Sequence, residues 1–262
     1  MPPARTNDEE TGRRPAAAAA ALLSVSLRTL RDLVFPPVCL HCGGLCEDSL
    51  LRHVCRRCDP LLVRVVPPHC LTCGHPFFGV LEGERLCPHC DGLQPAYREA
   101  RTLTLLKGPA RDLVLGLKYR SAFHVRADLE VLERENAGFC TFIHGAHLVP
   151  VPLHPRKERE RGYNQSLLLA EAFVRAVAGA ATIRPVLQRV EDSETQTVYD
   201  RKARRERMKN AFAPVPGADI TPGHRYILVD DVFTTGSTLN ACARALRRAG
   251  ALNLDVVTFG HG

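Results

Sequence analysis

Four Cys-x-x-Cys pairs dominate the first third of the chain and constrain its folding more than any other feature. They fall within residues 36–92, and 12 and 13 residues separate the two pairs of each half. The pairs are Cys39 with Cys42, Cys55 with Cys58, Cys70 with Cys73, and Cys87 with Cys90. Nine of the 11 cysteines lie in this stretch, so they belong to a local structural unit and not to the core of the whole fold.

A Cys-x-x-Cys turn places two thiolates on one side of a tight loop, and two such turns complete a tetrahedral zinc site. Four turns therefore predict two closed, structural Zn²⁺ sites, whose binding energy folds a segment with little core of its own. Pairing in chain order is the simplest, but the spacing also permits the first turn to pair with the last. Disulfides fit a secreted chain, a redox pair normally occurs singly, and iron–sulfur ligation lacks its usual clustered spacing.

Other potential ligands lie close to these turns. Cys46 stands between two pairs, and we interpret it as a spare thiol. Four histidines are near enough to replace a cysteine, although the full cysteine count makes this unnecessary: His41, His69, His75 and His89.

The chain divides into three expected parts. We predict an extension with a short helix over 1–35, the double zinc ribbon over 36–92 and a larger domain over 93–262. Residues 1–20 mix charges, prolines and alanines, a composition that predicts disorder. Acidic residues stand where a signal peptide needs a positive region, so we do not interpret this segment as a signal peptide. No apolar stretch approaches the ~20 residues that cross a bilayer. We therefore expect a cytoplasmic chain with reduced cysteines and no membrane span.

The larger domain alternates between two kinds of pattern. Short apolar runs predict strands over 100–106, 147–152, 226–231 and 252–260. Amphipathic spacing predicts helices over 109–120, 164–177 and 237–250. Such alternation predicts an α/β fold with a mostly parallel sheet covered on both faces.

Two adjacent carboxylates, Asp230 and Asp231, stand at the expected end of one strand, where ligands bind in such sheets. A hydroxyl-rich turn around one glycine follows and comprises Thr234, Thr235, Gly236, Ser237 and Thr238. The turn opens a helix, whose first amides and dipole can hold a phosphate. Carboxylates can accept hydrogen bonds from a vicinal diol or hold Mg²⁺. Together they predict a ribose 5-phosphate site, and the alternatives are a helix cap beside a solvated strand end or a phosphoacceptor aspartate.

The stretch around these residues, ILVDDVFTTGST, resembles the 5-phosphoribosyl-1-pyrophosphate motif of type I phosphoribosyltransferases. The order of parts is similar to the ComF family, which is associated with DNA uptake in natural competence, including its GntX-like members. The resemblance covers residues 36–262 and is carried by the cysteine ribbons, LKYR (117–120), the segments 149–173 and 189–212, and the phosphate turn. It implies a type I phosphoribosyltransferase-like domain behind the double zinc ribbon.

The resemblance also implies roles for individual residues. Asp230 and Asp231 would hold the ribose diol and Mg²⁺, and the turn 234–238 would hold the 5-phosphate. In the loop after Pro152, His154 and Arg156 would face the pyrophosphate.

Residues 196–209 would form a mobile hood. Its cations available to a polyanion are Arg201, Arg204, Arg205 and Arg207. The family commonly has Thr in place of Ser193 and Asn in place of Arg207. Purine-specific transferases often place an acid at the position of Thr234, so no general base for a purine acceptor can be named and the catalytic residues stay unassigned.

Three functions are compatible with these patterns. The first is a ComF-like role in DNA uptake, with a phosphoribosyl pyrophosphate-type ligand, single-stranded DNA on the basic segments 154–165 and 201–209, and other competence proteins as partners. The net charge of +7 is by itself weak evidence for DNA binding, and a solvated helix face is the alternative for either basic segment. The aromatic content of 6% provides few stacking platforms. The second is an active phosphoribosyltransferase on an unknown nitrogen acceptor. The third is a zinc-ribbon scaffold that docks proteins and keeps the sugar site as a sensor, and the first can coexist with either.

Overall fold

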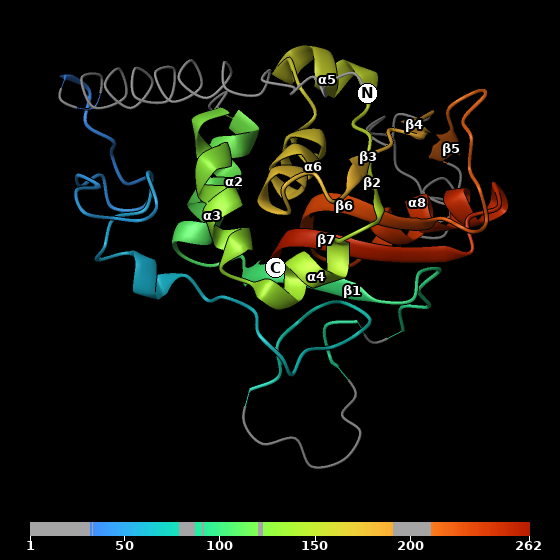
Figure 1. Ribbon diagram of the computed structural model, residues 1–262, viewed down its shortest axis with the longest axis horizontal. Coiled ribbons are helices and arrows are strands. Elements are labelled where there is room, and N and C mark those ends of the chain that lie inside the picture. Colours follow the sequence, from blue (N-terminus) through green and yellow to red (C-terminus); the bar gives the residue numbers. More distant parts are fainter. Residues whose placement is uncertain (1–31, 33, 79–86, 91, 120–122, 191–210) are drawn as a thin grey trace, which may run out of the picture.

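The computed structural model describes residues 32, 34–78, 87–90, 92–119, 123–190 and 211–262. The expected disordered extension over 1–20 and the expected hood over 196–209 lie outside these residues. The described part contains a cysteine-rich segment of loops and turns followed by an α/β unit (Figure 1).

Helices alternate with strands along the α/β unit. The α-helices are α2 (Pro109–Tyr119), α3 (Arg126–Arg134), α4 (Ala137–Ile143), α5 (Pro155–Arg161), α6 (Gln165–Ala176) and α8 (Ser237–Arg248). Short 3₁₀ turns are η1 (Asp59–Leu61) in the cysteine-rich segment and η2 (Phe123–Val125) before α3.

A five-stranded sheet forms the centre, with strand order β1-β7-β6-β2-β3. Its strands are β1 (Ala100–Leu105), β2 (His147–Pro150), β3 (Thr182–Ile183), β6 (Arg225–Phe233) and β7 (Asn253–His261). Every neighbouring pair runs parallel. The predicted fold class is therefore confirmed, because each expected strand and helix of the second domain is present and the sheet is parallel.

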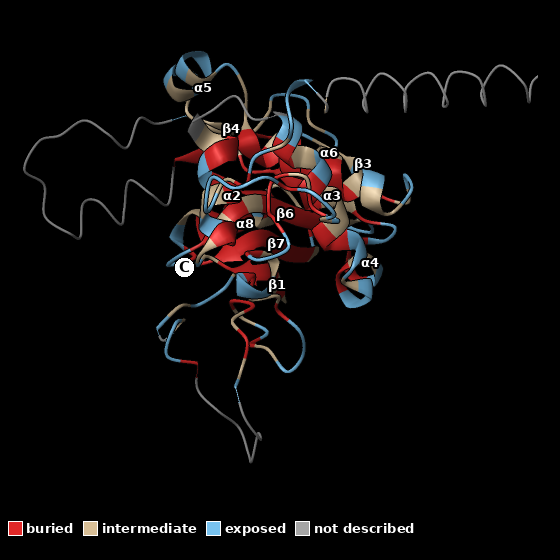
Figure 2. Cartoon of the chain, turned by 90° about the vertical axis from the view of Figure 1, so that its left-hand side faces the viewer, coloured by how far each residue is buried: buried red, intermediate tan, exposed pale blue. Residues whose placement is uncertain are grey.

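Both faces of the sheet are covered, as the apolar strand runs predicted. Alternate residues of a strand point to opposite faces. Ile227 and Val229 of β6 share one core with the helices α2, α3, α4 and α6. Tyr226 and Leu228 of the same strand share a second core with α8. The buried residues accordingly concentrate in the sheet and on the helix faces turned toward it (Figure 2).

The strand β6 is longer than its apolar run suggested. It continues past the two aspartates, because Val232 and Phe233 still pair with Gly260 and His261 of β7. Asp231 and Asp230 therefore lie two and three residues before the last residue of the strand rather than at its end. The long partner strand is the cause, since it supplies hydrogen-bond partners that the local sequence does not reveal.

The remaining elements had no sequence prediction. A small antiparallel pair, β4 (Leu187–Arg189) with β5 (Phe212–Pro214), packs beside α8. In the sequence these two strands flank the predicted hood. Helix α5 follows β2 directly, and its charged sequence has no apolar stripe that periodicity could have detected.

The two halves of the cysteine-rich segment pack against different faces of the sheet. Cysteines of the first half share the core of α2 and α3, and cysteines of the second half share the core of α8. Between them, Val63 and Val65 exchange backbone hydrogen bonds with Leu105 and Leu103 of β1. The linker thus covers the exposed edge of β1, a position that otherwise invites unwanted strand pairing. Within the described ranges no helix has the length and apolarity to span a bilayer.

Candidate functional site: two cysteine clusters and an acidic pair in β6

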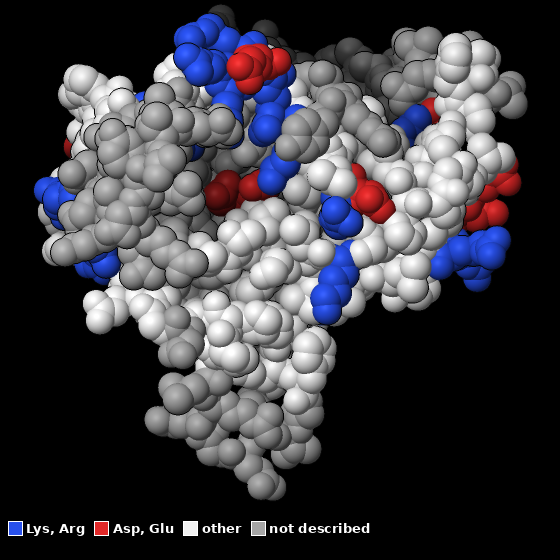
Figure 3. Space-filling model, turned by 180° about the vertical axis from the view of Figure 1, so that it is seen from behind, with Lys and Arg blue, Asp and Glu red and all other residues white. Residues whose placement is uncertain are grey.

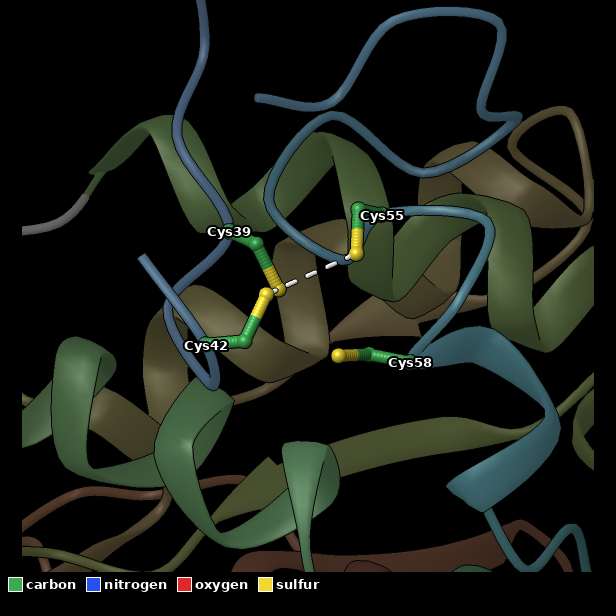
Figure 4. Close-up of side chains that lie close together, drawn as sticks. All are labelled: Cys39, Cys42, Cys55 and Cys58. Carbon is green, nitrogen blue, oxygen red and sulfur yellow. Dashed lines mark hydrogen bonds between the residues drawn. The ribbon is translucent and has the colours of Figure 1, made fainter. Parts of the chain in front are cut away.

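The eight cysteines of the four pairs gather into two clusters. One contains Cys39, Cys42, Cys55 and Cys58, whose sulfur atoms point toward a common centre (Figure 4). The other contains Cys70, Cys73, Cys87 and Cys90. The turns therefore pair in chain order, and the alternative of first with last is excluded.

The spacing of the sulfur atoms fits zinc. Cys42 Sγ and Cys55 Sγ are 3.7 Å apart, and the sulfurs of Cys70 and Cys90 are 3.6 Å apart. A tetrahedral ion with Zn–S bonds of about 2.3 Å has sulfur–sulfur edges of about 3.8 Å. Two closed four-thiolate sites of this size fit a double zinc ribbon, and each would hold one structural Zn²⁺. Cys46 belongs to neither cluster, and burial raises the pKa of its thiol to about 12.

The first turn of each ribbon repeats the same backbone. In one, the amide of Cys39 donates to the carbonyl of Gly44; in the other, the amide of Cys70 donates to the carbonyl of His75. The glycine after the second cysteine, Gly43 or Gly74, has a φ of 75° in both turns. A side chain at Gly74 would also lie 2.7 Å from Thr102 Oγ1 of β1, so glycine lets the second ribbon approach the sheet.

Neighbouring helices hold the acidic pair in β6. Asp230 is half-buried and Asp231 is 5% exposed. Ser166 Oγ donates to Asp230 Oδ1 at 3.0 Å, and Lys118 Nζ lies 2.5 Å from Asp231 Oδ2. Burial raises the pKa of Asp230 to about 8, and Asp231 adds to the rise. The Asp231 amide, the Ser166 hydroxyl and the Lys118 charge act against it.

Lys118 and Ser166 received no role from the sequence. Both lie in segments that carried the family resemblance, LKYR and 149–173, and that was the only signal for them. Asn164 explains the position of Ser166: its side chain accepts the Ser166 amide at 2.9 Å and donates to the carbonyl of Val151 at 3.0 Å. This bridge places the start of α6 against the end of β2 and beside Asp230.

The hydroxyl-rich turn after β6 is built around Gly236, which has a φ of 70°. A Cβ at this position would lie 2.6 Å from the Phe233 ring, so only glycine fits. Thr234, Thr235 and Ser237 are exposed, and Thr238 is half-buried. The N-cap residue Gly236 has no side chain to cap α8, and the Ser237 amide makes only a long bond to Thr235 Oγ1 at 3.4 Å. The first turn of the helix is therefore accessible to an anion. The predicted residues of the turn therefore lie together at a helix start.

The structure places His154 and Arg156 at the start of α5. The His154 ring accepts the Arg156 amide at 3.3 Å, so one ring nitrogen caps this helix. Viewed from the side opposite to that of Figure 1, acidic side chains lie in a hollow, and lysine and arginine side chains gather above it over α5 (Figure 3). The predicted hood residues Arg204 and Arg205 lie outside the described residues.

Comparisons with known proteins agree with this two-part organisation. Residues 30–91 match the double zinc ribbon domain, and residues 168–260 match the phosphoribosyl transferase domain. Among solved structures, a hypoxanthine phosphoribosyltransferase from Staphylococcus aureus aligns with 51% of this chain and 62% of its own. Its identity is 16% and its TM-score is 0.32. The fold assignment rests on the strand order and the two domain matches.

Curated relatives match over most of their length. The DNA utilization protein YhgH of Salmonella typhi is 30% identical over 84% of this chain and 91% of its own. Competence protein F of Haemophilus influenzae is 28% identical over 83% and 94%, respectively. Competence protein ComFC of Bacillus subtilis is 26% identical over 75% and 79%. The two cysteine clusters, the parallel sheet and these matches over most of the chain together show that it belongs to the ComF family, in which a double zinc ribbon precedes a phosphoribosyltransferase-like domain.

Proposed function

We propose that this chain acts in DNA uptake during natural transformation and binds a phosphoribosyl pyrophosphate-type ligand together with Mg²⁺. The names of its relatives, competence proteins and DNA utilization proteins, support the first part. The match to the phosphoribosyl transferase domain and the chemistry of the β6–α8 unit support the second.

One arrangement carries the ligand proposal. Two carboxylates in β6 are followed within the same strand–turn–helix unit by a glycine-built turn and a helix start whose N-cap is a glycine. The turn 234–238 would hold the 5-phosphate through amides and hydroxyls. The carboxylates would hold the ribose diol directly or through Mg²⁺, which supplies a charge bridge to the diphosphate.

Lys118 acts in this proposal as an internal counter-ion. In the ligand-free chain its ammonium neutralises Asp231 at 2.5 Å. Mg²⁺ or a ribose hydroxyl would take over part of that role, and Lys118 would then be free to face a diphosphate oxygen. Arg156 adds a positive charge to the rim of the proposed site, and the ring of His154 lies beside it at the start of α5.

Calorimetry with phosphoribosyl pyrophosphate and Mg²⁺ tests this site. We expect the Asp230→Asn/Asp231→Asn double variant to lose measurable binding, and the control Asp112→Asn/Asp219→Asn, which removes two carboxylates elsewhere, to bind as the unaltered chain does. Unaltered binding by the first variant would refute the site. If it loses binding but supports normal transformation in a host lacking this chain, the pocket has no part in uptake.

Single-stranded DNA is the second ligand of the proposal. Its phosphates would contact the basic segments 154–165 and 201–209, and binding would weaken as salt increases. We expect the Arg204→Ala/Arg205→Ala variant to bind a fluorescent single strand more weakly and with a smaller salt slope. An unchanged affinity would show that these arginines of the predicted hood do not contribute to DNA binding.

Turnover of the sugar diphosphate is a second candidate function, favoured by the match of residues 168–260 to a transferase domain. Pyrophosphate release from the Mg²⁺-bound ligand in the presence of candidate nitrogen acceptors distinguishes it from simple binding. A cytoplasmic location, where thiols stay reduced, and contacts with other competence proteins complete the proposal.

A further inference from the structure

Three histidines form a cluster that neither the zinc ribbons nor the proposed sugar site uses. They are His75 and His89 of the second ribbon and His261 at the end of β7. One ring nitrogen of each lies within 4.8 Å of one on each of the others. The cluster joins parts of the chain separated by more than 170 positions in sequence, since His89 and His261 contact each other edge to face with ring centroids 5.4 Å apart.

His261 gives the cluster a fixed, buried member. It is 3% exposed, and its Nε2 atom has no hydrogen-bond partner among the residues that the structure describes. Its ring is stacked on Phe233 at 5.3 Å and meets the edge of His75 at 4.9 Å. A buried polar atom without a partner is costly, so this nitrogen is expected to serve a bound group.

The first ribbon serves as an internal comparison. The backbone of the cysteine turns repeats, so His75 occupies the position of Gly44, and His89, between Cys87 and Cys90, occupies that of Arg57. Neither of those residues offers an imidazole. The first ribbon forms its four-cysteine cluster without a histidine at either position. The second ribbon therefore does not need His75 or His89 for its own four-cysteine site.

We propose that His75, His89 and His261 bind a third Zn²⁺ ion, with three imidazoles as ligands and a water molecule in the fourth position. Neutral imidazole is the commonest zinc ligand besides thiolate. Zn–N bonds of about 2.0–2.1 Å require nitrogens about 3.4 Å apart. Rotation of the exposed His89 ring and the half-exposed His75 ring can close the cluster onto the buried His261.

This ion would connect the second ribbon directly to the sheet. His261 pairs with Phe233 in the β6–β7 ladder, and the Phe233 ring packs beneath Gly236 of the phosphate turn. Zinc at the three histidines would therefore hold the ribbon against the strands that end beside this turn. Its open fourth position distinguishes it from the two closed cysteine sites.

The test counts zinc in the full-length chain after equilibrium dialysis against buffered free Zn²⁺. We expect three equivalents for the unaltered chain and two for His89→Gln and for His75→Gln. The matched control Arg57→Gln changes the equivalent position of the first ribbon and should retain three. His261→Asn, which alters a buried residue, serves as a third variant only if its circular dichroism matches that of the unaltered chain.

Two zinc equivalents in the unaltered chain would overturn the proposal. So would a third equivalent that persists in either His89→Gln or His75→Gln, because the site needs both imidazoles. The loss of one equivalent in both variants, with retention in Arg57→Gln, supports it whatever the folding of the His261 variant. This result does not depend on sugar or DNA binding.

Discussion

Asp230 lies in surroundings that oppose the negative charge a Mg²⁺-dependent ligand site requires. Burial raises its pKa to about 8, with a further rise from Asp231. The native chain therefore keeps a proton that the unfolded chain loses at about pH 4. The contribution of this proton to the stability of the folded chain falls as the pH rises from about 4 to about 8. For the same reason, binding of a cation beside Asp230 should release a proton.

The affinity for phosphoribosyl pyrophosphate with Mg²⁺ should rise with pH for this reason. Below about pH 8 we expect up to a tenfold gain per pH unit, since one proton must leave Asp230, and a plateau above it. Calorimetry in buffers of different ionisation enthalpy measures both the affinity and the released proton.

Ser166→Ala provides the matched control for this pH profile. Its hydroxyl donates to Asp230 and lowers the carboxyl pKa, so its removal should move the plateau to higher pH. If the affinity does not change with pH, or if Ser166→Ala does not move the pH at which it reaches the plateau, Asp230 does not release the proton.

At the scale of elements, α3 holds the first zinc ribbon through one carboxylate. Asp128 is 1% exposed and accepts the backbone amides of Arg52 and His53 at 2.7 and 2.8 Å. It also lies 3.2 Å from the ring of His53. These amides precede Cys55, so the carboxylate positions the second cysteine turn of this ribbon.

Asp128→Asn should loosen that ribbon. An amide has one acceptor oxygen in place of two, so one buried N–H group loses its partner at about 1–3 kcal/mol. We expect a lower urea midpoint and faster release of one zinc equivalent to a coloured chelator.

Asp112→Asn, at the half-exposed contact with His41, is the matched control and should change neither quantity appreciably. Equal zinc release from both variants would contradict the proposed role of Asp128.

The two ribbons lie on opposite faces of one sheet, and among the described residues it is the second ribbon that adjoins the phosphate turn. Leu93, just after the second ribbon, packs against Gly236. The side chain of Asn240 in α8 accepts the Ala96 amide at 2.8 Å and donates to the Gln94 carbonyl at 2.9 Å. The start of α8 is therefore braced by the chain that leaves the second zinc site.

Loss of the second zinc should consequently weaken sugar diphosphate binding, whereas loss of the first should not. We expect Cys90→Ser to reduce affinity tenfold or more, about 1.4 kcal/mol, and Cys42→Ser to leave it within about twofold. Zinc analysis must confirm that each variant loses one equivalent. Equal effects of the two variants would show that the ribbons are not coupled to the turn in this way.

Short-range chemistry explains what the sequence could predict. The Cys-x-x-Cys spacing specifies a thiolate pair because both ligands belong to one turn, and the glycine-containing turn after β6 specifies a helix start for the same reason. The strands and helices of the parallel sheet were predictable because their apolar residues repeat along a few turns or pleats. The assignment of the ligand to Asp230, Asp231 and the turn remains a prediction for the experiments above.

Long-range contacts decided the rest. The ion pair of Lys118 with Asp231, the hydrogen bond of Ser166 to Asp230 and the meeting of His75, His89 and His261 depend on how distant segments pack. The sequence by itself determined two zinc-binding ribbons and a parallel α/β domain, because each follows from spacing within a local segment. Only the tertiary structure decided the chain-order pairing of the cysteine turns, the faces they cover and the raised pKa of Asp230, because burial and contact across the sheet have no signature in local spacing.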